Sequence, residues 1–247
     1  MAVVRSNVAK AFIAATLLAG CIPAEPYDRE FAGQFENKGV ANEQLFASGY
    51  FPPSFASPQV HCGFRSDPIE LISEFEENWY PSQWKAAREP SFYLLSKQER
   101  PPEFALRFSY IPSFSSSVFI RIQKDGDEYW LIAKQMNGAG GYDPGSIDRS
   151  KRNRLSSRQV AELQRLLTED ALFSEPSDEC QSGFGFDGTQ WIYELIDPNG
   201  YRMVKRRSPS QGTDYNLGQY LIELSGWNVS CWSSLPRPFS DVELLCE

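Results

Sequence analysis

The sequence predicts an α+β fold: a single antiparallel sheet of about five strands, made of two hairpins plus one strand, with two to four helices. Apolar and polar residues alternate in several short segments, and two pairs of these segments flank glycine-containing turns. Apolar residues at helical spacing lie before, between and after them. Because sequential antiparallel strands are interspersed with helices, we expect helices on one face of the sheet.

The first helix is expected to begin near Ser66, where Ser66-Asp67-Pro68 is a capping residue followed by proline in the first turn. Apolar residues then recur at helical spacing as far as Trp79. Pro81 is expected to end this helix, and residues 82–88 are expected to form a second short one.

The first strand is predicted from residue 104, where Phe104, Leu106, Phe108 and Tyr110 alternate with Ala105, Arg107 and Ser109. This pattern is typical of a half-buried strand whose Arg107 side faces solvent. Two further alternating segments, 118–123 and 129–134, flank an Asp-Gly turn and predict a hairpin. A loop is expected to follow.

The next helix begins with a capping box of Ser156 and Gln159 and a hydrophobic staple of Leu155 and Val160. Its predicted buried stripe consists of Val160, Leu163, Leu166 and Leu167. A second hairpin is expected over 189–207, with its turn at residues 197–200. A last helix over about 217–225 is expected to end at Gly226.

The N-terminus has the form of a bacterial lipoprotein signal. A weakly basic start and a short apolar run lead to Leu18-Ala19-Gly20-Cys21. We expect cleavage before Cys21, which would then carry a diacylglyceryl thioether and an N-acyl chain such as palmitate and so attach the protein to the membrane. Ile22 in the next position favours the outer membrane, facing the periplasm, if the source has two membranes. The expected organisation is a signal peptide at 1–20, a tether at 21–60, a globular domain at 61–233 and a tail at 234–247.

Charge and cysteine content narrow the classes of partner. Cleavage removes two basic residues, which leaves 22 basic against 32 acidic residues and a net charge of −10. Because nucleic-acid binding needs a basic footprint, we expect no nucleic-acid partner. In an oxidising compartment four cysteines predict two disulfides with three possible connectivities. These cysteines are Cys62, Cys180, Cys231 and Cys246.

Several motifs resemble a family of exported or lipid-anchored bacterial proteins to which no activity is assigned. They are Gly138-Ala139-Gly140-Gly141-Tyr142-Asp143-Pro144-Gly145, Asp187-Gly188-Thr189-Gln190-Trp191-Ile192, Arg207-Ser208-Pro209, and Leu217-Gly218 with Leu221. The resemblance covers about 150 residues, from Trp79 to Trp227, and implies an envelope location but no activity. The four cysteines are not part of the pattern.

The glycine-rich motif is the candidate binding loop. Its four glycines allow close approach of the backbone to a ligand, and Tyr142, Asp143 and the later Asp187 are candidate contacts. The spacing fits neither a dinucleotide fingerprint nor a P-loop, and we expect no cofactor. The alternative is that the motif has no binding role and forms a tight turn between a strand and a helix. Seven basic residues are expected to be solvated, and the alternative is that they bind a phosphate or an acidic partner: Arg149, Lys151, Arg152, Arg154, Lys205, Arg206 and Arg207.

Enzyme chemistry is not favoured by the residue inventory. His61 is the only histidine, so a Ser or Cys nucleophile would lack its usual base. A histidine-rich zinc site is excluded, whereas carboxylate sites stay open. The leading hypothesis is a non-enzymatic, lipid-anchored envelope protein that binds another protein or a cell-wall component. The alternatives are an inhibitor or immunity protein against an exported toxin, and a periplasmic carboxylate-dependent enzyme.

Overall fold

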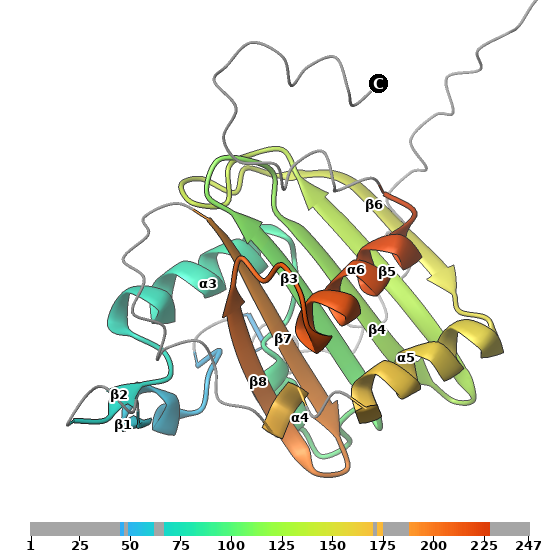
Figure 1. Cartoon of the computed structure of the whole chain (residues 1–247), viewed down its shortest axis with the longest axis horizontal. Helices are drawn as coiled ribbons and strands as arrows, with labels where there is room; N and C mark the ends of the chain where they lie inside the picture. Colours follow the sequence, from blue (N-terminus) through green and yellow to red (C-terminus); the bar gives the residue numbers. More distant parts are fainter. Residues whose placement is uncertain (1–44, 47–48, 62–66, 170–171, 175–187, 228–247) are drawn as a thin grey trace, which may run out of the picture.

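A computed structural model describes residues 45–46, 49–61, 67–169, 172–174 and 188–227. Its centre is a six-stranded antiparallel sheet in the order β6-β5-β4-β3-β7-β8 (Figure 1). The strands are β3 (Ala105–Pro112), β4 (Val118–Asp125), β5 (Glu128–Met136), β6 (Ile147–Arg154), β7 (Thr189–Asp197) and β8 (Gly200–Arg207). The α+β class and the antiparallel sheet are thus confirmed, with one more strand than expected in that sheet. The expectation of a single sheet is wrong, because β1 (Pro58–Val60) and β2 (Ile69–Glu70) pair in a separate two-stranded sheet.

The helices lie on both faces of the sheet, not on one. They are α3 (Glu74–Ala86), α4 (Phe92–Ser96), α5 (Ser157–Glu169) and α6 (Thr213–Ser225). In Figure 1, α5 and α6 cross the front of the sheet and α3 lies behind it. The expected one-sided arrangement is therefore wrong. Every residue of the central strand β3 is buried, because a helical layer covers each of its faces.

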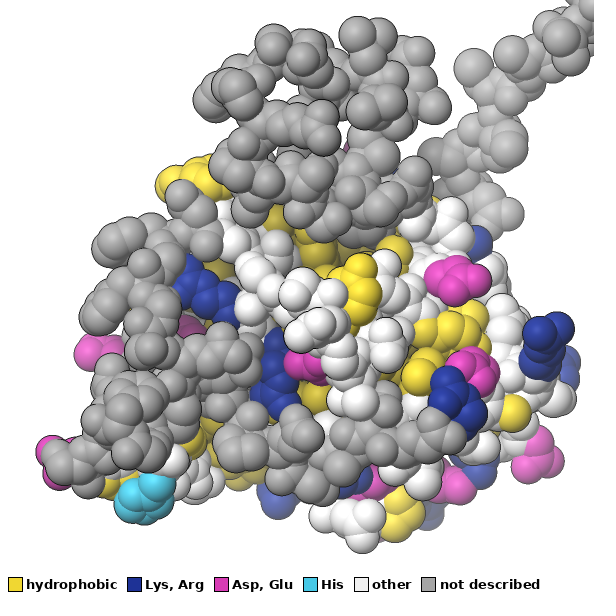
Figure 2. All heavy atoms as spheres, viewed as in Figure 1, with side chains coloured by type: hydrophobic (Ala, Val, Ile, Leu, Met, Phe, Trp, Pro, Cys, Tyr) yellow, Lys and Arg dark blue, Asp and Glu magenta, His cyan; other side chains and the backbone are white. Residues whose placement is uncertain are grey.

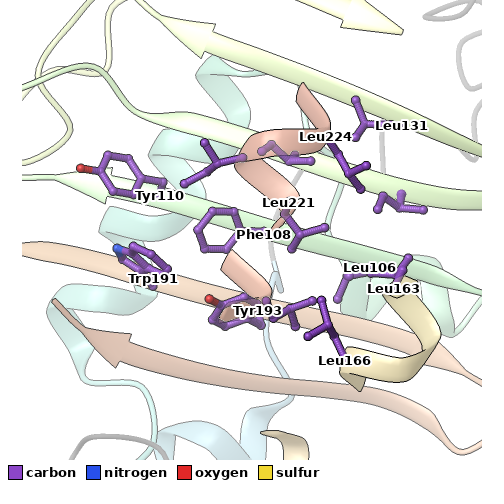
Figure 3. Packing of buried hydrophobic residues seen from close by; sticks show 14 of the residues in the cluster. Leu106, Phe108, Tyr110, Leu131, Leu163, Leu166, Trp191, Tyr193, Leu221 and Leu224 are labelled. Atoms are coloured by element: carbon purple, nitrogen blue, oxygen red, sulfur yellow. The ribbon is translucent and has the colours of Figure 1, made fainter. Parts of the chain in front are cut away.

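The face under α5 and α6 is a continuous hydrophobic core (Figure 3). Leu106, Phe108 and Tyr110 of β3 meet Leu163 of α5 and Leu221 of α6 in it. The Ser156–Gln159 capping box is present, since the Gln159 amide N–H donates to Ser156 Oγ at 3.3 Å and the Ser156 N–H donates to Gln159 Oε1 at 2.9 Å. The predicted stripe of this helix is confirmed. Leu163 and Leu166 are buried, and Val160 and Leu167 pack against the same cluster.

Both predicted hairpins and the end of the last helix are confirmed. Gly126 has a φ of +58° in the turn between β4 and β5, and Gly200 has a φ of +102° after β7. Gly226 caps α6 in the left-handed region with a φ of +70°. These positive φ angles explain why glycine follows each element at these points.

The strand β6 was missed in the sequence, where a loop was expected. Its sequence has one apolar residue, Ile147, followed by a largely charged run. It pairs with β5 alone, at the edge of the sheet, and it contributes little to either core. An edge strand does not need apolar alternation, so periodicity could not identify it.

The second face is covered by α3, α4 and the chain around η1 (Pro53–Ala56), β1 (Pro58–Val60) and β2 (Ile69–Glu70). Two expectations about α3 are wrong. It begins after Ser73, whose side chain forms a capping box with Glu76, and it runs through Pro81 to Ala86. Burial of Tyr80 and Trp84 on either side of Pro81 holds the helix together there, because both rings pack into one cluster under the sheet.

The packed body includes chain that was expected to be tether. Tyr50 and Phe51 are buried, and both rings pack against Trp84 at centroid distances of 5.7 Å and 5.5 Å. Leu45 is buried beside α4. Packing into the globular body therefore begins by Leu45 instead of residue 61. The sequence did not predict this, because the apolar residues of this segment are scattered among prolines.

Candidate functional site

The glycine loop, residues 137–146 between β5 and β6, folds back on itself. The amide of Gly138 donates to the Pro144 carbonyl at 3.1 Å, and the amide of Ala139 donates to the Asp143 carbonyl at 2.8 Å. These bonds close the loop without side chains. The loop is thus a small structured unit with a defined shape.

This loop is seated on the connection between β3 and β4. The Gly140 amide donates to Ser115 O at 3.0 Å, and the Gly141 amide donates to Ser113 O at 3.1 Å. A Cβ on Gly140 would lie 2.7 Å from Pro112 O, and one on Gly141 would lie 2.6 Å from Ser113 O. Close backbone approach, not positive φ, therefore demands glycine at these two positions.

Helix α3 holds the same loop from the other side. The Gly140 carbonyl accepts hydrogen bonds from Trp79 Nε1 at 3.2 Å and from the buried Gln83 Nε2 at 2.8 Å. Gln83 Oε1 in turn accepts a hydrogen bond from Ser117 Oγ at 3.2 Å. Three separate elements are thereby tied together at Gly140. No sequence pattern predicts this joint, because Gln83 resembles any polar residue on a helix.

Four aromatic side chains surround this joint. Tyr142 of the loop is 72% exposed and lies against Phe114, which is 54% exposed, at a centroid distance of 5.9 Å. Phe75 of α3 is 68% exposed and stacks on Trp79 at 5.5 Å. We call Phe75, Trp79, Phe114 and Tyr142 the aromatic surface. Tyr142, Phe114 and Phe75 are the strongly exposed large hydrophobic residues in the part of the chain that the structure describes.

The aromatic surface lies at one end of the sheet. The β3–β4 and β5–β6 connections are both at the top of Figure 1, and Figure 2 shows hydrophobic side chains projecting at the upper left of the same view. Stacking at i and i+4 fixes Phe75 on Trp79, and the Ser73–Glu76 capping box fixes the first turn that carries Phe75. The ring of Phe75 is therefore presented by a capped helix.

The three candidate residues of the sequence have different outcomes. Tyr142 belongs to the aromatic surface. The exposed Asp143 accepts a hydrogen bond from the Gly145 amide at its Oδ1, at 2.8 Å, and so shapes the turn. Asp187 lies outside the described residues, although the neighbouring Gly188 exchanges hydrogen bonds with Ser113.

On the face that α3 and α4 cover, the sheet carries a cluster of buried charges that the sequence did not reveal. We call it the buried charge cluster; it consists of Glu89, Arg107, Arg121, Lys134 and Glu194. Arg107 Nη2 lies 2.5 Å from Glu194 Oε2, Arg121 Nε lies 3.2 Å from Glu89 Oε2, and Lys134 Nζ lies 2.6 Å from Glu89 Oε1. Arg107 is opposite both Arg121 and Glu194 in the strand register, so three adjacent strands carry its centre.

The pKa values of the two carboxylates in the cluster, Glu89 and Glu194, are shifted in opposite directions. Burial alone would raise the pKa of Glu89, but the charges of Arg121, Lys134 and Arg107 outweigh it and lower that pKa. Burial dominates at Glu194 and raises its pKa, although Arg107 opposes the shift. Burial also lowers the pKa of Lys134. All five side chains are at least 93% buried, so the cluster has a structural role and is inaccessible to a substrate.

Two of the seven bases expected to be solvated are buried instead. Lys205 Nζ pairs with Glu76 Oε1 at 2.7 Å, and Arg206 Nε pairs with Asp214 Oδ2 at 2.9 Å. The carboxylates come from α3 and α6, which cover opposite faces of β8. That expectation was wrong for these two residues, because both faces of β8 are covered.

Across the described ranges, no three His, Cys, Asp or Glu side chains are grouped so that they could hold a metal ion. A search of the same ranges finds no helix with the length and hydrophobicity needed to cross a membrane. Cys21 and the four candidate disulfide cysteines, Cys62, Cys180, Cys231 and Cys246, lie outside the described residues.

In comparisons with known proteins, the chain matches no protein-family model and no curated protein.

Proposed function

We propose that the protein is a lipid-anchored component of the bacterial envelope that binds another protein through the aromatic surface. Its anchor is Cys21, and its binding contacts are Tyr142, Phe114, Phe75 and Trp79. It works as a binding protein and not as an enzyme. The proposal rests on one observation: three strongly exposed aromatic rings gather around a loop that buried hydrogen bonds hold in place.

The stability of the fold does not explain these exposed rings. An exposed aromatic ring adds little to the core, whereas aromatic residues are enriched among the residues that dominate binding energy. A preorganised surface also loses little conformational entropy on binding. Gln83, buried and bonded to Gly140 O at 2.8 Å, provides this preorganisation from below.

The chemistry of the rings favours a protein partner over a cell-wall glycan. Phe75 and Phe114 offer hydrocarbon faces with no hydrogen-bonding group, and the ring N–H of Trp79 is already donated to Gly140 O. Sugar recognition requires several free polar groups beside the ring, whereas an apolar protein patch requires mainly shape. We therefore expect a partner with an apolar surface.

Site-specific photo-crosslinking tests this directly. A crosslinking amino acid in place of Tyr142, in the lipidated full-length protein, should capture a discrete partner in cells. The matched control places the same amino acid at Asp127, in the β4–β5 turn at the opposite end of the strands. Capture at 142 that disappears with Phe114→Ala, and no capture at 127, would support the proposal. Equal capture at both positions, or capture of glycan alone, would refute it.

The anchor has its own test. Cys21→Ala should abolish metabolic labelling with a fatty acid and should leave either uncleaved precursor or soluble exported protein. Cys231→Ala is the control and should label normally. Labelling that survives in Cys21→Ala would end the lipoprotein interpretation without touching the binding proposal.

A further inference from the structure

The edge strand β6 is a basic element in an acidic protein. Its eight residues include four bases and one acid, Asp148, which gives the strand a net charge of +3. The whole chain, by contrast, has a formal net charge of −8. Charge complementarity therefore favours an acidic partner at β6 and disfavours pairing between the β6 strands of two copies. The four bases are Arg149, Lys151, Arg152 and Arg154.

The two edges of the six-stranded sheet differ in how open they are. Strand β8, at one edge, has four buried residues, 203–206, and its Arg202 lies 5.3 Å from the ring centroid of Phe173 in η2 (Leu172–Ser174). No residue of β6, at the other edge, is buried, and among the described strands β6 pairs only with β5. Figure 1 shows β6 as the right-hand border of the sheet. Within the described residues, its outer N–H and C=O groups have no ladder and can accept an added strand.

The bases of β6 are divided equally between the two faces of the sheet. Arg149 and Lys151 are on the face that α5 and α6 cover, since Lys151 is opposite Ala133 in the register. Arg152 and Arg154 are on the other face. Successive side chains of an added strand would also point to opposite faces. A segment with acidic residues on both faces would therefore meet opposite charge on each.

Neighbouring groups hold two of the bases in defined positions. The Arg149 guanidinium lies 4.5 Å from the ring centroid of Trp227, and its Nε donates to Gln135 Oε1 at 2.5 Å. The Arg152 guanidinium lies 4.0 Å from the ring centroid of Trp130. Side chains that are already ordered lose less conformational entropy when they bind a partner.

The bases differ in how much they contribute to the fold. Lys151 Nζ donates to Ser225 O at 3.0 Å and so holds the end of α6. Arg149 and Arg154 are the exposed bases of the strand. Arg154 Nη1 lies 2.7 Å from Glu128 Oε1, in a pair that is itself exposed. Because exposed pairs contribute little to stability, Arg149 and Arg154 are the residues to change in a test of binding.

We propose that β6 binds an extended acidic segment of another protein, which adds to its outer edge as a further strand. The main chain of the segment supplies the ladder hydrogen bonds, and its carboxylates meet the bases of β6 on both faces. Recognition depends on charge more than on apolar contact, because β6 has a single apolar residue, Ile147. Strand β6 shares no residue with the aromatic surface, so this binding is independent of the function proposed above.

Fluorescence anisotropy of the full chain with a labelled peptide tests the proposal. The peptide has eight residues, the length of β6, and repeats two glutamates followed by one valine. It should bind, and its addition should slow amide exchange about tenfold over 147–154 but not over 200–207. The matched peptide is N-methylated at every amide. It keeps the charges but cannot donate to the ladder, so it should bind at least about tenfold more weakly.

Charge-reversed variants test the role of the bases. Arg149→Glu with Arg154→Glu should weaken binding of the acidic peptide about tenfold and should gain binding of a peptide with lysine in place of glutamate. This gain would also show that the variant is folded. The matched control, Arg158→Glu with Arg165→Glu, makes the same change of charge at exposed positions of α5 and should bind the acidic peptide as the parent does.

Four results would overturn the proposal. Absence of peptide binding would remove it directly, and equal binding of the N-methylated peptide would reduce the contact to charge attraction without an added strand. An equal loss of binding in the α5 control would show that net charge alone matters. Tighter binding of duplex DNA or of anionic vesicles than of the acidic peptide would assign the bases of β6 to another class of partner.

Discussion

The two faces of the sheet are built in different ways, although helices pack on both. The face under α5 and α6 is closed almost entirely by hydrocarbon, with Leu106, Phe108 and Leu163 at its centre. The opposite face combines a buried aromatic cluster with the buried charge cluster. The aromatic cluster consists of Tyr50, Phe51, Tyr80 and Trp84. Hydrophobic burial suffices to hold the first face, whereas the second depends on matched charges that cannot be solvated once buried.

The second face is also connected to the proposed binding surface at the end of the sheet. Helix α3 contributes Tyr80 and Trp84 to the buried aromatic cluster. The same helix is joined to the glycine loop at Gly140 by hydrogen bonds from Trp79 and Gln83. The following predictions test how far the two faces differ, from the largest expected effect to the smallest.

The largest effect is expected at Glu89. Glu89→Gln keeps the size of the side chain but leaves Arg121 and Lys134 without their shared carboxylate. Breaking a buried ion network costs about 3–5 kcal/mol of unfolding free energy. Chemical denaturation at neutral pH measures it. Glu162→Gln is the control, an exposed pair with Arg165, and should leave stability unchanged. A Glu89→Gln loss no larger than the control would show that the cluster is not needed.

On the hydrocarbon face, Leu163→Ala should cost about 2–5 kcal/mol because it opens a cavity in a fully buried site. Val160→Ala, on the same helix and only partly buried, should cost clearly less. The same denaturation experiment checks both. If the two losses were equal, α5 would not bury the face that its periodicity predicts.

Much of the hydrocarbon face could be predicted from sequence, and most of the charged face could not. Period-two alternation placed Leu106 and Phe108 on one side and gave both hairpins. The same alternation placed Arg107 on a side expected to face water, and it is completely buried. Its partners Glu89 and Glu194 are 18 and 87 positions away in the chain, and no local pattern connects them.

The candidate site divides in the same way. The glycine loop and Tyr142 could be found from composition, because four glycines in eight residues indicate close backbone packing. Phe75, Trp79 and Phe114 could not be assigned to the site, since the packing of α3 against Gly140 is a tertiary contact. Strand β6 escaped detection because charge replaces alternation at an edge.

A substitution at Gly140 tests the joint between the second face and the loop. Gly140→Ala places a Cβ 2.5 Å from Ser117 Oγ and 2.7 Å from Pro112 O. Overpacking of this kind costs about 1–3 kcal/mol. A thermal melt should show the loss. Gly126→Ala is the comparison: its added Cβ would meet no atom within 4 Å, but its φ is +58°. It should cost about 1 kcal/mol by backbone strain alone. A Gly140→Ala protein as stable as the parent would contradict the joint.

The pH dependence of the charged face should have two opposite signs. Because the pKa of Glu89 is lowered in the folded protein, its stabilisation is present above its ordinary value of 4.5 and lost as pH falls through the folded pKa. The raised pKa of Glu194 acts conversely. Its contribution is present below 4.5 and lost as pH rises through the folded pKa. Stability measured from pH 3 to 7 should therefore show the Glu89→Gln loss shrinking in acid and the Glu194→Gln loss growing.

Leu163→Ala is the control for this experiment, because no titrating group lies in the hydrocarbon it removes. Its loss should not vary with pH over the same range. Identical pH profiles for Glu89→Gln and Glu194→Gln would contradict the opposite shifts.

The smallest effect on stability, and the most informative for function, is expected at Tyr142. Its ring is 72% exposed and contacts Phe114, itself more than half exposed, so Tyr142→Ala removes little buried area. The melting temperature should stay within about 1 °C of the parent, since substitutions at such surface sites usually change stability by under 0.5 kcal/mol. Capture of the crosslinked partner through position 114 should nevertheless fall, because aromatic contacts carry a large share of interface energy. Asp127→Ala, at the far end of the strands, should change neither measurement. A Tyr142→Ala protein that melts much earlier would show that the ring stabilises the loop, and the binding proposal would then lose its central observation.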